Sequence, residues 1–101
     1  MTDIAKGYWV VHNSVFDAVE FENYKAAAGP ALAAYAPKVL AMGGQYEQAE
    51  GSGRDATVVI EFESYAAAVE CYHSEAYQTA VALRKDIAEF DFVILEGMLP
   101  A

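Results

Sequence analysis

Positive charge is scarce in this sequence. It holds 6 lysine and arginine residues against 15 aspartate and glutamate residues, a formal net charge of −9. Such an acidic field repels the phosphate backbone of nucleic acids and the anionic surface of membranes, so we expect neither as a partner. Apolar runs are short as well. None approaches the roughly 20 residues of a membrane-spanning helix, and we expect no secretory signal at the start.

Cysteine is almost absent, since Cys71 is the only one. A lone thiol forms no internal disulfide and is typical of a reducing compartment, so we expect a cytoplasmic protein. Glu70 beside it would raise the thiol pKa, and His73, two positions along a helix, would not face it. Cys71 is therefore predicted to be an unreactive core residue.

A chain of 101 residues with 55% hydrophobic composition is expected to form one domain, residues 1–101, around one core. Four apolar segments, most of them rich in β-branched and aromatic residues, predict strands. They are Tyr8–His12, Lys38–Met42, Thr57–Phe62 and Phe90–Glu96, and residues 45–50 can extend the second strand beyond a bulge at Gly43-Gly44.

Helical periodicity fills the segments after the first and third strands. Asp17 followed by Glu20 is a capping-box pattern that begins the first helix, and Pro30 predicts a kink or two helical pieces. Ser64 caps the second helical segment, which breaks at His73-Ser74 and then continues. The order strand-helix-strand-strand-helix-strand predicts an α+β fold, a ferredoxin-like antiparallel sheet with the helices on one face.

The predicted strands are apolar on both faces. In the last one, Phe90, Phe92 and Ile94 alternate with Val93 and Leu95. Two helices cover only one face, and the other would expose more apolar area than a soluble monomer usually does. We therefore expect a homodimer that packs sheet on sheet about a two-fold axis, although the pattern does not tell which face meets the partner. The alternative, a parallel sheet inside a larger α/β fold, requires a longer chain.

Two glutamates end otherwise apolar strands, Glu61 and Glu96. A buried carboxylate needs a partner, and the candidate cations are Arg54 and Arg84. One interpretation is a pair of stabilising salt bridges at the ends of the sheet. The other is the polar mouth of an apolar pocket, which is the usual form of a small-molecule site.

Metal and cofactor motifs are missing from the sequence. His12 and His73 lack any metal-ligand spacing, and Gly43-Gly44 has neither of the glycine-rich phosphate-loop patterns. We therefore predict no metal site and no cofactor requirement.

The leading functional hypothesis is an enzyme acting on a small, apolar or weakly acidic molecule. His73 suits proton transfer at neutral pH, and Arg84 suits a carboxylate or enolate oxygen. The candidate catalytic residues are His73 and Glu61, and the candidate substrate-binding residues are Tyr72, Arg84, Arg54 and Trp9. The alternative is a non-catalytic ligand-binding or stress-associated module in which these residues only support the fold. The test that separates them is whether the polar groups share one pocket.

Several stretches together resemble the domain of unknown function 1330 family of the dimeric α+β barrel superfamily. They are Lys6–Trp9, Gly43-Gly44, Val59–Phe62, Cys71–Ser74 continuing through Tyr77-Gln78 to Leu83-Arg84, and Ile94–Gly97. The resemblance implies a ferredoxin-like fold and a two-fold dimer whose sheets enclose a barrel. It implies no activity, although relatives on this fold include cofactor-free monooxygenases, haem-degrading enzymes and dehalogenase-like or isomerase-like enzymes.

The chain departs from the family pattern at three positions. The family often has arginine before the glycine pair, where this chain has Met42, and proline where it has Glu63 and Glu75. An anionic-ligand role for that arginine therefore does not transfer to this chain.

Overall fold

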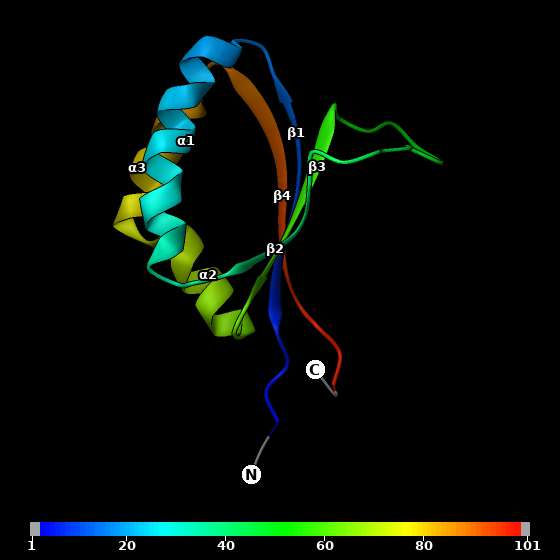
Figure 1. Ribbon diagram of the computed structural model, residues 1–101, viewed down its shortest axis with the longest axis vertical. Coiled ribbons are helices and arrows are strands. Elements are labelled where there is room, and N and C mark those ends of the chain that lie inside the picture. The colour runs from blue at the N-terminus through cyan, green and yellow to red at the C-terminus, as the bar shows by residue number, and fades with distance from the viewer. Residues whose placement is uncertain (1–2, 100–101) are drawn as a thin grey trace.

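The computed structural model describes residues 3–99. Its elements are β1 (Gly7–Val15), α1 (Ala18–Ala33), β2 (Lys38–Met42), β3 (Ala56–Phe62), α2 (Tyr65–His73), α3 (Glu75–Arg84) and β4 (Ala88–Glu96). The four strands form one antiparallel sheet in the order β2-β3-β1-β4, the ferredoxin-like arrangement predicted from the sequence. Figure 1 shows all three helices on one side of this sheet. None of the helices within residues 3–99 is long and apolar enough to cross a membrane.

The strands agree with the sequence prediction except at their ends. β2 has the predicted bounds, whereas β1 and β4 are longer than predicted. The predicted extension of β2 over 45–50 is wrong, because these residues lie in the connection to β3. The pairing irregularity lies between Val39 and Ala41, inside β2, and not at the glycine pair. We call residues 43–55 the β2–β3 arm, which projects from the side of the sheet opposite the helices (Figure 1).

Each helix begins directly after a side chain that caps its N-terminus. The Asp17 carboxylate accepts a hydrogen bond from the backbone N–H of Glu20 at 3.1 Å. Ser64 caps α2, and Ser74 ends α2 and caps α3. Pro30 lies inside a continuous α1, so the predicted division into two pieces does not occur. A proline removes only one hydrogen bond, and packing on the sheet can offset that loss.

Trp9 is at the centre of the core on the helix-covered face of the sheet. It is 1% exposed, and the rings of Phe62, Tyr77 and Phe92 lie with their centroids 4.8–4.9 Å from its own. Its indole N–H donates to the backbone carbonyl of Ala68 in α2 at 2.9 Å. Trp9 therefore joins β1, β3, β4, α2 and α3 in one packed unit.

The opposite face of the sheet, which we call the open face, is uncovered and largely apolar at its centre. Strand alternation places Val10, Val59 and Val93 side by side on it, with Leu95 next to Tyr8. Val93 is 51% exposed and Leu95 is 41% exposed. The prediction that the strands are apolar on both faces is thus confirmed, and the structure shows that the helices cover the face with Trp9.

Candidate functional site

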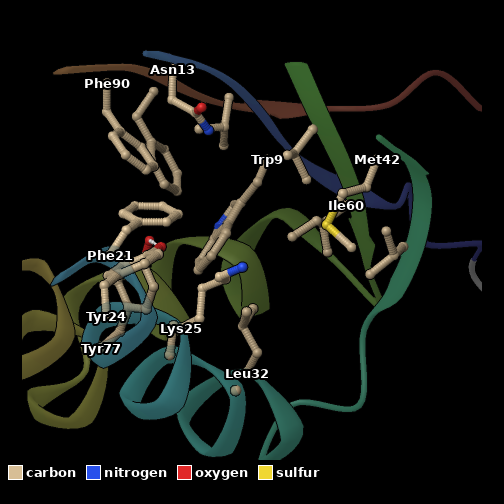
Figure 2. Close-up of a pocket in the computed structure, with 16 residues that line it drawn as sticks. Trp9, Asn13, Phe21, Tyr24, Lys25, Leu32, Met42, Ile60, Tyr77 and Phe90 are labelled. Atoms are coloured by element: carbon tan, nitrogen blue, oxygen red, sulfur yellow. Dashed lines mark hydrogen bonds between the residues drawn. The ribbon is translucent and has the colours of Figure 1, made fainter. Parts of the chain in front are cut away.

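A pocket of about 320 Å³ lies between the covered face of the sheet and α1. Figure 2 shows Trp9 projecting from β1 into the middle of this region, with Ile60 and Met42 on one side and Phe90 on the other. Phe21 and Leu32 of α1 form the facing wall. The volume lies at the small end of ligand sites and suits a molecule of one or two rings.

Few polar groups line the pocket. The hydroxyl groups of Tyr24 on α1 and Tyr77 on α3 meet at 2.6 Å, and Figure 2 shows their oxygens together beside Phe21. Asn13 comes from β1, and Lys25 lies at the rim, where its ammonium group pairs with Glu22 at 2.9 Å. An apolar cavity with a few fixed polar groups can hold and orient a small molecule.

The Tyr77 hydroxyl is neutral at physiological pH. The side chain is 1% exposed, and burial raises the pKa of Tyr77 far above its usual value, with Tyr24 adding to the rise. The nearby guanidinium group of Arg84 opposes the rise. Tyr77 is therefore a hydrogen-bonding group here and not a proton acceptor.

Arg84 is buried beside the pocket without a carboxylate. It is 8% exposed, and its guanidinium carbon lies 3.7 Å from the ring centre of Phe90 and 5.3 Å from that of Tyr24. Within residues 3–99 it forms no salt bridge, and its Nε atom is buried without a hydrogen-bond partner. A buried arginine normally pairs with an anion, so this one is an exception.

The structure brings some of the predicted site residues together and separates others. Trp9 lines the pocket, and Arg84 contacts the two pocket residues named above. Tyr72 packs against the Trp9 ring at 6.3 Å but is not part of the lining. His73 is exposed at the end of α2. Glu61 alternates with inward-facing neighbours on β3 and so lies on the open face, which means that the predicted polar residues do not share one pocket.

The predicted salt bridges of the strand-end glutamates are wrong. Glu61 accepts a hydrogen bond from the Tyr8 hydroxyl at 3.0 Å, and this bond raises the pKa of Tyr8. Arg54 pairs with Glu89 at 2.6 Å and with Asp91 at 2.8 Å, and none of the three lines the pocket. Arg54 thus serves as an ion-pair partner at one end of β4.

Cys71 is fully buried, as the sequence predicted. Burial, together with the nearby Glu70 carboxylate, raises the pKa of its thiol to about 11. The thiol is therefore protonated at neutral pH and is a packing residue in α2.

Most pocket residues were missed by the sequence reasoning. Phe21 and Tyr24 have the helical spacing of a buried stripe, which by itself does not indicate a ligand contact. Asn13 follows Trp9 and Val11 at alternate positions of β1, so it is a polar residue on an otherwise apolar face. That interruption is the signal that could have indicated a ligand contact.

Solved structures of other proteins have a similar fold. A protein of unknown function from Rhodopseudomonas palustris, RPA0582, is 20% identical with a TM-score of 0.72, covering 95% of this chain and 85% of that one. SnoaB, a cofactor-independent oxygenase from Streptomyces nogalater, is 15% identical with a TM-score of 0.62, covering 96% and 99% respectively. At these identities the likeness shows the shared ferredoxin-like α+β fold alone.

No curated protein matches this chain. The family comparison is more specific, because one model covers nearly all of the chain, residues 6–98. The sequence motifs, the strand order and this match agree, and the chain belongs to the family described as domain of unknown function (DUF1330).

Proposed function

We propose that the pocket beside Trp9 binds a small, largely apolar, weakly acidic molecule, and that the protein acts on it without an organic cofactor. The observation that supports this proposal is the pocket itself, which has aromatic and aliphatic walls and a pair of hydrogen-bonded tyrosines as its buried polar group. Such a cavity excludes water from a planar ligand and offers hydrogen bonds to one oxygen atom.

An oxygenase reaction on an electron-rich phenol or enol is compatible with this pocket. Once such a molecule is ionised, it can react with dioxygen directly, so the protein has only to hold the anion and exclude water. The same-fold protein SnoaB is a cofactor-independent oxygenase, which supports this reaction class by analogy of fold.

The second candidate, a non-catalytic ligand-binding module, has one observation in its favour. The two candidate catalytic residues, His73 and Glu61, lie outside the pocket, on the exposed end of α2 and on the open face. In this alternative the protein binds the same class of molecule but does not transform it.

A thermal-shift screen of small phenols tests the binding proposal. Neighbouring residues of β3 give a matched pair of variants: Val58 lines the pocket, and Val59 faces away from it. Val58→Phe fills the pocket and is expected to abolish the shift produced by any ligand found. Val59→Phe adds the same atoms to the open face and is expected to keep that shift. An equal shift in both variants would locate the ligand elsewhere. Consumption of dioxygen in the presence of a ligand, measured with an oxygen electrode, then distinguishes the enzyme from the binding module.

The homodimer is also a proposal, and the open face is its interface. A second copy stacked on that face would cover Val10, Val59, Val93 and Leu95. Val59→Glu would bury an unpaired carboxylate there and is expected to give monomers in sedimentation equilibrium. The matched control is Val19→Glu on α1, because Val19 is 81% exposed. A monomeric wild-type protein, or equal association of the two variants, would exclude this interface.

We further propose that the protein works in the cytoplasm. The proposal is supported by the single cysteine, Cys71, which is unpaired and protonated within the core. Fractionation of cells that express the protein at its natural level tests this location.

A further inference from the structure

The buried charge of Arg84 has no anion to balance it in residues 3–99. Its guanidinium is stacked on Phe90 and lies near the ring of Tyr24. Cation–π contacts of this kind offset part of the desolvation cost, but they satisfy none of the N–H groups. An arginine is not deprotonated in proteins, so a fixed positive charge sits directly behind the pocket wall.

Burial gives a direction to the tyrosine pair. Either oxygen could be the donor of the 2.6 Å hydrogen bond between Tyr24 and Tyr77. Tyr77 is 1% exposed, whereas Tyr24 is only partly buried and lines the pocket, so the Tyr24 hydroxyl is the one within reach of a ligand. When Tyr24 donates its proton to an anion, it can only accept from Tyr77, so the hydrogen bond of the pair then runs from Tyr77 to Tyr24.

We propose that Tyr77 and Tyr24 form an ordered chain of hydrogen-bond donors, with the buried charge of Arg84 beside it, and that this chain binds the single anionic oxygen of a phenolate or enolate in the pocket. The proposal rests on the proposed ligand-binding function and names the form in which the ligand binds. Hydrogen bonds in such a chain polarise one another, so the buried charge strengthens the donor that reaches the ligand.

The arrangement favours one anionic oxygen over a carboxylate. A carboxylate is best bound by the two parallel N–H groups of an arginine fork. Arg84 is not among the residues that line the pocket, and its guanidinium is stacked on Phe90. The lining instead offers the hydroxyl of Tyr24, so the ligand oxygen meets one donor at this point.

Other charged groups near the pocket do not replace this chain. Lys25 is the only charged residue of the described lining, and its ammonium group is already paired with Glu22 at the rim. The acidic residues Glu89 and Asp91 of β4 pair with Arg54 on the open face. The positive charge that faces the tyrosine pair is therefore that of Arg84.

The test uses 4-nitrophenol, whose anion has its own visible absorbance, and 4-nitroanisole, a neutral compound of nearly the same shape. Wild-type protein is expected to lower the pKa of bound 4-nitrophenol and to bind its anion about tenfold more tightly than 4-nitroanisole, the effect of about one charge-assisted hydrogen bond. Tyr24→Phe and Arg84→Met are each expected to remove most of this preference while keeping the affinity for 4-nitroanisole within about twofold. Lys85→Met is the control, because Lys85 is an exposed cation outside the pocket lining, and it is expected to keep the preference.

Circular dichroism establishes that each variant is folded, and Tyr24→Phe, which removes one oxygen atom, provides the test if Arg84→Met does not fold. Equal affinity of wild-type protein for the two compounds would overturn the donor chain and leave the pocket proposal intact. A preference for the 4-nitrophenol anion that survives Tyr24→Phe would also overturn the donor chain and leave the pocket proposal intact. Failure of both compounds to bind wild-type protein would overturn the pocket proposal and the donor chain together.

Discussion

Gly7→Ala is expected to be strongly destabilising because β1 passes directly over the beginning of α2. A Cβ atom on Gly7 would lie 2.6 Å from the carbonyl carbon of Ser64 and from the Cα of Tyr65, and closer still to the Ser64 carbonyl oxygen. Ordinary carbon contacts are about 3.5–4.0 Å, so one backbone has to move by roughly 1 Å. No flexible side-chain end is among these contacts, so the strain cannot be relieved by rotating a side chain.

The expected cost follows from what must move. Overpacking a core typically costs about 1–3 kcal/mol. Displacing Ser64 also disturbs the cap of α2, in which its hydroxyl accepts from the N–H of Ala67 at 3.0 Å, and a lost cap costs about 0.5–2 kcal/mol. The sum is about 1.5–5 kcal/mol, a large fraction of the roughly 5–15 kcal/mol that keeps a domain folded.

Gly29→Ala is the matched control, since it makes the same chemical change where space is free. A Cβ there has no neighbour within 4 Å, and Gly29 lies inside α1, so alanine should stabilise the fold by about 0.5–1 kcal/mol. Urea unfolding followed by circular dichroism gives both free energies of unfolding. If Gly7→Ala unfolds within about 0.5 kcal/mol of the wild-type protein, the close approach of β1 and α2 is not as the structure has it.

Three further predictions concern the core and the surface. Trp9→Phe removes the indole N–H that donates to the Ala68 carbonyl and is expected to lower the free energy of unfolding by about 1–3 kcal/mol in urea titrations, so a neutral result would contradict the bond. The thiol of Cys71 is expected to react with a thiol reagent far more slowly in native protein than in urea, and equal rates would contradict its burial. Arg54 lowers the pKa of Asp91, so this pair contributes stability above pH 3.8 and loses it as the pH falls through the lowered pKa. The deficit of Arg54→Gln in urea unfolding should therefore shrink in strong acid, and a constant deficit would argue against the pair.

Local sequence signals predicted most of the fold. The caps at Asp17, Ser64 and Ser74 are short-range hydrogen bonds, so they are visible in the sequence itself. Pro30 misled the prediction because its penalty was read locally, whereas packing of α1 on the sheet keeps the helix continuous. The face that the helices cover was not predictable from alternation, because both faces carry apolar residues.

The candidate site was less accessible to sequence reasoning. Tyr24 and Tyr77 form the polar end of the pocket although they are 53 positions apart in the chain. Nothing local links them, and the same holds for the contact of Arg84 with Tyr24. The position of Glu61 was within reach, because alternation places it opposite Phe62 on any strand. The sequence reasoning therefore named Arg84 but could not predict its neighbours, Tyr24 and Phe90.

The position of Trp9 makes its fluorescence an intrinsic probe of the pocket. It is the only tryptophan in the chain, and it lies in the wall of the pocket against four other aromatic rings. Fluorescence excited selectively in the indole therefore comes from one place, the wall of the cavity proposed to hold the ligand. A nitroaromatic molecule bound there would lie within van der Waals range of the emitting ring and would quench it. Occupancy of the pocket can thus be followed in the unlabelled wild-type protein by the fluorescence intensity of Trp9.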